Sequence, residues 1–216
     1  MPASKLDAAF DRNAYEGFLF DCDGTLADSM PLHFQAWTET LTRKLGRPSD
    51  FTESLFYHFG GMPPRQIVER LNRELGYNLP PEETAEEKEA RFVELLPGIG
   101  PVPEVVEVLE GLDRTAKVAV ASGGQTDIVR TTLGHIGIPV GPNEIVKLVV
   151  GSDQVKQGKP SPELFLLTAK RLGVEPTRCL VFEDAGPGFL AAQAAGMAHI
   201  DIRPFRKTGV AAAARY

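Results

Sequence analysis

The sequence predicts an α/β protein with a doubly wound parallel sheet and an inserted all-helical segment. From residue 101 onward, short apolar runs typical of buried strands alternate with helical patterns. Another apolar run, at residues 18–20, precedes a block that contains helical patterns but no strand-like run. We therefore expect a Rossmann-like core domain made of residues 1–28 and 98–216, and a helical cap domain made of residues 29–97.

The expected elements follow the chain in that order. The strands are short and apolar, and lie at residues 18–20, 117–121, 148–150, 179–182 and 199–202. The core helices lie at 103–110, 125–136, 162–172 and 187–195, and the cap helices at 30–45, 51–59, 64–75 and 81–96. Each cap helix is bracketed by Gly or Pro, which commonly start or stop helices. The last is acidic, a pattern that we interpret as a solvated helix face; its acidic residues are Glu82, Glu83, Glu86, Glu87 and Glu89.

Composition limits the partners that the protein can have. The chain has 216 residues, of which 43% are hydrophobic, and this is enough for a substantial core. Its formal net charge of −6 disfavours binding to nucleic acid or to an anionic membrane, because both are polyanions. The N-terminal residues do not resemble a secretory signal, and no apolar stretch is long enough to cross a bilayer. We expect a cytoplasmic protein that is a monomer or a weak dimer.

Two carboxylates follow the first predicted strand. Asp21 and Asp23 stand on either side of Cys22, so both can face one site at the carboxyl end of the strand, where parallel α/β sheets bind ligands. Such close carboxylates repel each other unless a cation lies between them, and Mg²⁺ is the natural candidate. The alternative interpretation is that the pair simply ends a strand and begins a turn.

Three later stretches carry polar groups at similar places. Ser122 and Gly123 follow the second strand, Lys159 precedes a helix between two prolines, and Glu183 and Asp184 follow the fourth strand. A hydroxyl beside backbone amides can bind a phosphoryl group, and an ammonium held by prolines can neutralise one. Taken singly, each stretch could also be an ordinary turn or a solvated charge.

Together, these four stretches resemble the four motifs of the haloacid dehalogenase (HAD) superfamily, in the expected order and over nearly the whole chain. The resemblance implies that Asp21 attacks phosphorus and forms an aspartyl-phosphate, while Asp23 acts as the general acid and base. It implies that Lys159 is catalytic and that Thr25, Ser122 and Gly123 bind the phosphoryl group. Since haloacid dehalogenases themselves lack the second acidic residue, Asp23 disfavours halide displacement.

The resemblance also implies the metal and one substrate contact in the cap. The implied ligands of Mg²⁺ are Asp21, Asp23 (through its backbone carbonyl), Glu183 (directly or through water) and Asp184. In the cap, Lys88 matches a lysine that the family pattern often directs at the site. Gly61 belongs to a Gly-Gly pair that allows close approach to a substrate, and Arg65 offers a guanidinium for hydroxyls or an anion. His33 follows the first motif closely and can contact Asp23 or the substrate. The alternatives are a plain helix connection around Arg65 and an ion-pair role for Lys88.

The helical cap, the stretch His33 to Trp37 and the pair Glu183-Asp184 resemble the β-phosphoglucomutase-like branch of the superfamily. The strongest local likeness is to bacterial fructose-1-phosphate/6-phosphogluconate phosphatases. Ala185 and Pro64 depart from the mutase pattern, so we expect a Mg²⁺-dependent phosphatase of small phosphorylated metabolites, in particular sugar phosphates. The first alternative is β-phosphoglucomutase, an isomerase, and the more remote one is a non-catalytic HAD-fold binding protein.

Overall fold

The computed structural model describes residues 5–60 and 62–206. Its centre is a sheet of five parallel strands in the order β3-β2-β1-β4-β5. The strands are β1 (Gly17–Phe20), β2 (Lys117–Ala121), β3 (Val146–Val150), β4 (Cys179–Glu183) and β5 (Ala198–Asp201). This architecture confirms the predicted parallel α/β fold.

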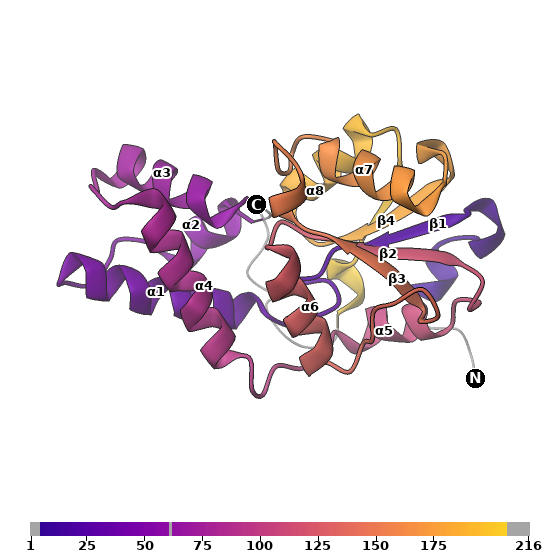
Figure 1. The fold of residues 1–216 in the computed structure, drawn as a ribbon, viewed down its shortest axis with the longest axis horizontal. Helices are drawn as coiled ribbons and strands as arrows, with labels where there is room; N and C mark the ends of the chain where they lie inside the picture. Colours follow the sequence, from indigo (N-terminus) through magenta and orange to yellow (C-terminus); the bar gives the residue numbers. More distant parts are fainter. Residues whose placement is uncertain (1–4, 61, 207–216) are drawn as a thin grey trace.

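Two helical layers cover the sheet. Helices α5 (Pro103–Glu110) and α6 (Thr126–His135) lie on one face, and α7 (Glu163–Leu172) and α8 (Gly186–Ala194) lie on the other (Figure 1). Successive side chains of a strand point to opposite faces, so Phe18 and Phe20 pack in the first layer while Leu19 packs in the second. Because both faces are covered, strands β1 and β4 are buried along their whole length, with no alternation of buried and exposed residues.

The chain reverses its direction of winding at β1. From β1 it proceeds to β2 and β3 on one side, and then returns to place β4 and β5 on the other side. Such a switch point leaves a crevice at the carboxyl ends of the two strands where the winding reverses. Strands β1 and β4 are neighbours, with Phe20 opposite Phe182, so the residues that follow them meet at this crevice.

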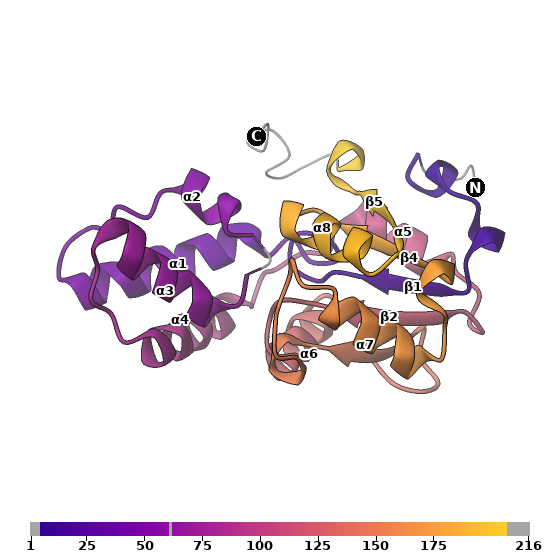
Figure 2. The same ribbon diagram turned by 90° about the horizontal axis from the view of Figure 1, so that it is seen from above.

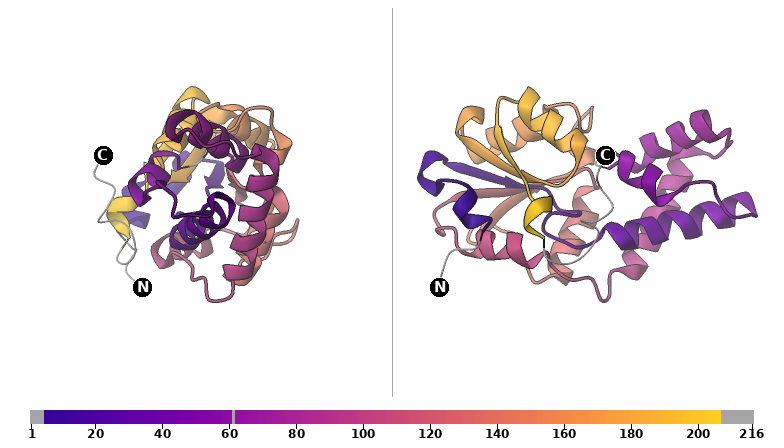
Figure 3. Two further views of the ribbon diagram at one scale, coloured as in Figure 1. Left: turned by 90° about the vertical axis from the view of Figure 1, so that its left-hand side faces the viewer. Right: turned by 180° about the vertical axis from the view of Figure 1, so that it is seen from behind.

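Four helices form a group beside the carboxyl edge of the sheet, which we call the cap (Figures 2 and 3). They are α1 (Met30–Leu45), α2 (Glu53–His58), α3 (Pro64–Leu75) and α4 (Pro81–Leu95). The cap has its own apolar cluster, which includes Trp37, Leu41, Phe59 and Leu71. A separate contact of Ala36 with Phe92 and Leu96 packs α1 against α4.

Short 3₁₀ turns complete the described structure. They lie at Asp7–Ala9, Arg12–Ala14, Ser152–Gln154, Pro176–Arg178 and Arg203–Phe205. Within residues 5–60 and 62–206, every helix is too short or too polar to cross a bilayer. The predicted helices and strands match the observed ones to within about two residues at most ends, as expected where helix ends fray.

The stacking of Phe182 on Phe20 allows a test of the core. Their ring centroids are 4.4 Å apart, and both side chains are fully buried. We expect Phe182→Ala to lower the free energy of unfolding by about 3–5 kcal/mol, because it removes buried apolar surface and leaves a cavity. Denaturant unfolding measures this. The control is Leu190→Ala, where the side chain is 57% exposed, and a comparable loss in both variants would contradict the expectation.

Candidate active site

A buried lysine lies between the ends of β1 and β4. Nζ of Lys159 donates to Oδ1 of Asp21 at 2.7 Å and also to Oε1 of Glu183. Lys159 is 1% exposed, Asp21 is 6% exposed and Glu183 is 1% exposed. Asp21 lies at this position because its amide donates to the carbonyl of Phe182 at 3.0 Å, continuing the pairing of β1 with β4.

This contact governs the charge of the groups in it. Burial raises the pKa of Asp21 well above its usual range, and the charges of Glu183, Asp184 and Asp23 raise it further, against the opposing effect of Lys159. Burial alone would lower the pKa of Lys159, but Asp21 and Glu183 outweigh burial and raise it. Lys159 is therefore held in its protonated, positively charged form between the two carboxylates.

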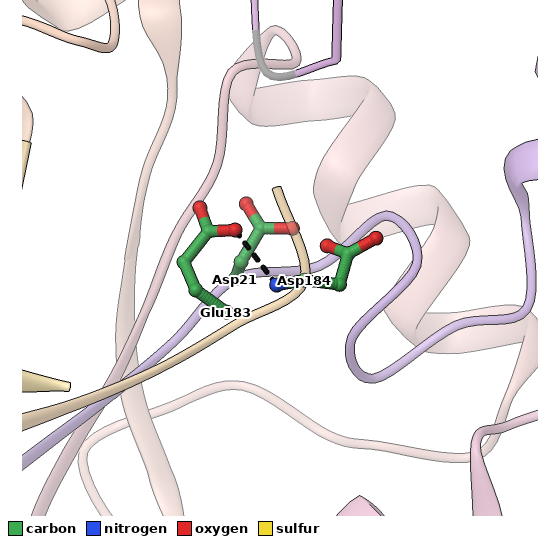
Figure 4. Close-up of side chains that lie close together, drawn as sticks. All are labelled: Asp21, Glu183 and Asp184. Carbon is green, nitrogen blue, oxygen red and sulfur yellow. Dashed lines mark hydrogen bonds between the residues drawn. The ribbon is translucent and has the colours of Figure 1, made fainter. Parts of the chain in front are cut away.

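Three carboxylates crowd the same crevice. Oxygens of Asp21, Glu183 and Asp184 lie within 4.8 Å of one another, at the ends of β1 and β4 (Figure 4). Burial raises the pKa of Asp184 to about 7, and the charge of Glu183 contributes. With three carboxylates against one ammonium, the cluster has an excess of negative charge and oxygen donors, which suits a hard divalent cation.

Within this cluster, Glu183 differs from the two aspartates. Its Oε2 accepts the backbone amides of Asp184 and Ala185, both at 2.9 Å, and its other oxygen accepts from Lys159. Asp184 instead accepts from the hydroxyl of Thr25 at 3.2 Å. Asp21 and Asp184 thus keep more of their oxygen lone pairs free for a metal than Glu183 does.

Asp23 lies on the opposite side of the crevice and faces the cap. Its Oδ1 accepts from Oγ of Ser29 at 2.7 Å and lies 3.0 Å from Nε2 of His33, and its Oδ2 accepts from Oγ of Ser122 at 3.4 Å. Burial acts to raise the pKa of Asp23, but His33 and Ser29, with a contribution from Lys88, lower it to about 2. Asp23 is therefore ionised in this arrangement.

The contacts of Asp23 continue into the cap. Nζ of Lys88 lies 2.7 Å from Nδ1 of His33 and donates to Oε1 of Glu89 at 3.0 Å. The His33 ring stacks on Phe92 at 3.7 Å between centroids. A continuous polar chain therefore links Asp23, on the loop after β1, to helices α1 and α4.

A cavity of about 80 Å³ lies between the crevice and the cap. From the core, it is lined by Asp21, Asp23, Ser122, Gly123, Gly124, Glu183, Asp184 and Ala185. From the cap, it is lined by Met30, His33, Trp37, Phe56, Phe59, Gly60, Met62, Pro64, Ile67, Lys88 and Glu89. A larger cleft of about 1520 Å³, bounded by both the cap and the core, reaches Lys159.

Most of the predicted site residues line this cavity, but three of those described do not: Lys159, Arg65 and Thr25. Lys159 borders the larger cleft and reaches the site through its contact with Asp21. Arg65 is directed away, with its side chain 63% exposed and paired with Glu69 and Glu82, so in this structure it does not reach the site. Thr25 is fully buried and donates to Asp184 without lining the cavity. Gly61 lies outside the described residues.

Two neighbours of the site were not predicted from the sequence. Ser29, the first residue of the expected cap domain, donates a hydrogen bond to Asp23. The interpretation of the acidic residues of α4 as one solvated face is wrong for Glu89, which is 6% exposed and lines the cavity. The available signal was its position on the same helical face as Ala85 and Phe92, both of which are buried.

The fold and the site together define an α/β enzyme with an acidic site at the carboxyl ends of its parallel strands. The chain belongs to the haloacid dehalogenase-like hydrolases, whose family model matches residues 15–196. This confirms the family indicated by the four motifs. Together with the phosphatases among its relatives, it identifies the chain as a phosphoric monoester hydrolase.

Three relatives illustrate the similarity. The chain is 37% identical to the fructose-1-phosphate phosphatase YqaB of Escherichia coli (strain K12), over 88% of this chain and 97% of the relative. It is 31% identical to hexitol phosphatase A of the same organism, over 84% and 80%. A solved β-phosphoglucomutase from Clostridium difficile superposes with a TM-score of 0.75 at 26% identity, covering 87% of this chain and 84% of the other.

The charge excess of the carboxylate cluster predicts a pH-dependent stability. Since the folded state raises the pKa of Asp184 to about 7, it holds a proton that the unfolded chain has lost, and stability falls as pH rises from about 4 to about 7. In metal-free protein, we expect Asp184→Asn to raise Tm more at pH 8 than at pH 5. Thermal unfolding at both pH values measures this. An equal change in Tm at the two pH values would contradict the assignment.

Proposed function

We propose that this protein is a Mg²⁺-dependent phosphatase of small phosphorylated sugars that acts through an aspartyl-phosphate intermediate. The observation that carries the proposal is the buried contact of Lys159 with Asp21 at 2.7 Å, directly beside the acidic cluster. The sugar part of the proposal is supported by the relatives named as phosphatases of fructose 1-phosphate and of hexitols.

In the first proposed step, an oxygen of Asp21 attacks phosphorus, and the bond from phosphorus to the ester oxygen breaks. Asp23, which is ionised before substrate binds, takes up a proton from solvent as the anionic substrate enters and gives that proton to the departing oxygen. In the second step, Asp23 takes a proton from water, whose oxygen attacks the phosphoryl group and releases Asp21. Lys159 and the hydroxyl of Ser122 hold the phosphoryl oxygens, where negative charge must be stabilised.

The donor set at the crevice suits Mg²⁺. Asp21 and Asp184 would hold the ion, and Glu183 would orient Lys159 and the backbone after β4. When bound, Mg²⁺ supplies positive charge that offsets both the carboxylates and the phosphoryl oxygens. The crowding of three carboxylates around one ammonium supports this proposal.

The cap residues would position the general acid. Lys88 has only donors, so Nδ1 of His33 must accept from it, and Nε2 must carry the ring proton toward Asp23. His33 is thereby held in one tautomer and orients Asp23.

The division into a core domain (1–28 and 98–216) and a cap domain (29–97) is part of the proposal. It is supported by the separate apolar cluster of the cap. Loops of the two parts approach closely: a Cβ placed at Gly158 would lie 2.8 Å from Cγ of Pro63, and one at Gly60 would lie 3.5 Å from Cβ of Ala185. Closure of the cap would exclude water from the phosphoryl group until the product leaves.

A second candidate function, an isomerase of the β-phosphoglucomutase type, is favoured by the structural similarity to that enzyme. It differs only in the group that attacks the phosphoenzyme, a sugar hydroxyl in place of water. The outward placement of Arg65 at the start of α3 favours the phosphatase. A mutase presents an arginine to its substrate from about this position, whereas the described residues that line the cavity include no arginine.

The first experiment is phosphorus NMR of the protein with Mg²⁺ and fructose 1-phosphate, and separately with β-glucose 1-phosphate and a trace of glucose 1,6-bisphosphate. We expect growth of inorganic phosphate, lost by at least about a thousandfold in Asp21→Asn because the nucleophile is gone. Conversion of β-glucose 1-phosphate to glucose 6-phosphate with little free phosphate would favour the isomerase. Unchanged turnover in Asp21→Asn would refute the assignment of Asp21 as the nucleophile.

Lys88 allows a test of the positioning role of His33. We expect Lys88→Met to lower kcat about 10–100-fold, because His33 loses the contact that orients its proton toward Asp23. The matched control is Lys44→Met, which breaks another contact between α1 and α4, with Glu83 and Glu87, away from the cavity. Steady-state kinetics with fructose 1-phosphate measures both. An equal loss of kcat in the control would indicate a purely structural effect.

A further inference from the structure

Glu89 lines the cavity and has a buried carboxylate oxygen without a hydrogen-bond partner. The residue lies in α4 and its side chain is 8% exposed. Its Oε1 accepts from Lys88 at 3.0 Å, whereas Oε2 is buried and has no hydrogen-bond partner among the described residues. A buried charged oxygen without a donor is costly, so this oxygen is suited to a donor that a ligand brings.

The surroundings of Glu89 are otherwise apolar or already engaged. On the cap side of the cavity, the polar side chains are those of His33, Lys88 and Glu89. Lys88 contacts His33 and Glu89, and its ammonium lies 5.5 Å and 5.2 Å from the ring centroids of Trp37 and Phe92. Among the cavity-lining side chains of the described part of the cap, Glu89 is therefore the one that has a carboxylate oxygen, Oε2, without a donor.

Charge determines what that ligand can be. Lys88 and Glu89 form a neutral pair, so this wall offers no spare positive charge to a second anionic group. It offers a negative oxygen, which accepts well from hydroxyl groups and repels phosphate or carboxylate. The phosphoryl group of the substrate would lie at the opposite wall, at Asp21 and Lys159, so the wall of Glu89 faces the rest of the molecule.

We propose that Glu89 is a specificity-determining residue that accepts hydrogen bonds from hydroxyls of the sugar and excludes substrates with a second anionic group. The proposal rests on the proposed function and deepens it. The substrate class becomes the monophosphates of neutral sugars and polyols. Bisphosphates are excluded, and so are phosphorylated sugar acids such as 6-phosphogluconate, which the likeness to fructose-1-phosphate/6-phosphogluconate phosphatases had left open. Specificity of this kind arises as much from repulsion of the wrong ligand as from attraction of the right one.

The test compares two probes that differ by one phosphate, fructose 1-phosphate and fructose 1,6-bisphosphate. The wild-type protein is expected to prefer the monophosphate in kcat/KM. In Glu89→Gln, the ratio of the two kcat/KM values falls by about tenfold or more, because a charge-assisted bond to the sugar is weakened and the repulsion is removed. Taking the ratio cancels any change in the chemical step that both probes share.

Two variants serve as controls. Glu86→Gln makes the same substitution three residues earlier in α4, on an exposed side chain, and is expected to keep the wild-type ratio. Glu89→Asp keeps the charge with a shorter side chain, and is expected to keep discrimination against the bisphosphate. An unchanged ratio in Glu89→Gln, or an equal loss for both probes, would overturn the proposal.

Measurements of substrate binding distinguish the proposed role of Glu89 from the proposed phosphatase activity. In the Asp21→Asn background, calorimetry measures the dissociation constants of both probes with and without Glu89→Gln. Absence of phosphate release by wild-type protein refutes the phosphatase, whereas an altered ratio of dissociation constants would still support the role of Glu89. If both ratios stay at their wild-type values while phosphate is released, the phosphatase stands and the role of Glu89 is refuted.

Discussion

The contact on which the site depends is that of Lys159 with Asp21 and Glu183. A carboxylate buried alone would lose its charge, and the ammonium between two carboxylates is what opposes this loss for Asp21. It also ties the loop before α7 to the ends of β1 and β4. The pairing of those two strands and the covering of both sheet faces bring the charges together in a buried crevice.

The second group of polar side chains, around Asp23, has the opposite effect on the pKa of its carboxylate. Here the neighbours of the carboxylate are donors, and they lower its pKa to about 2 against the effect of burial. Two carboxylates separated by one residue thus have pKa values displaced in opposite directions, because Asp21 lies among other carboxylates and Asp23 lies among donors. Because His33 and Lys88 belong to the cap, the state of Asp23 depends on where the cap lies.

Several parts of this site could be predicted because their signals are local. Asp21, Ser122 and Asp184 each follow an apolar strand, and parallel strands place such residues on one edge. The inference failed where contact depends on packing between helices. Arg65 was expected at the substrate, yet it pairs with Glu69 one turn along its own helix and with Glu82 of α4. Glu89 was expected in solvent, yet α4 turns it inward beside Phe92.

The sequence by itself determined the order of strands and helices, the all-helical character of residues 29–97 and the chemistry at each strand end. These depend on periodicity, turn residues and local motifs, which short stretches of chain encode. Only the tertiary structure decided which charges meet: that Lys159 bridges Asp21 and Glu183, that Lys88 holds His33, and that Glu89 keeps one oxygen free. Such contacts join residues far apart in the chain, and burial, which sets their strength, exists only once the layers have packed.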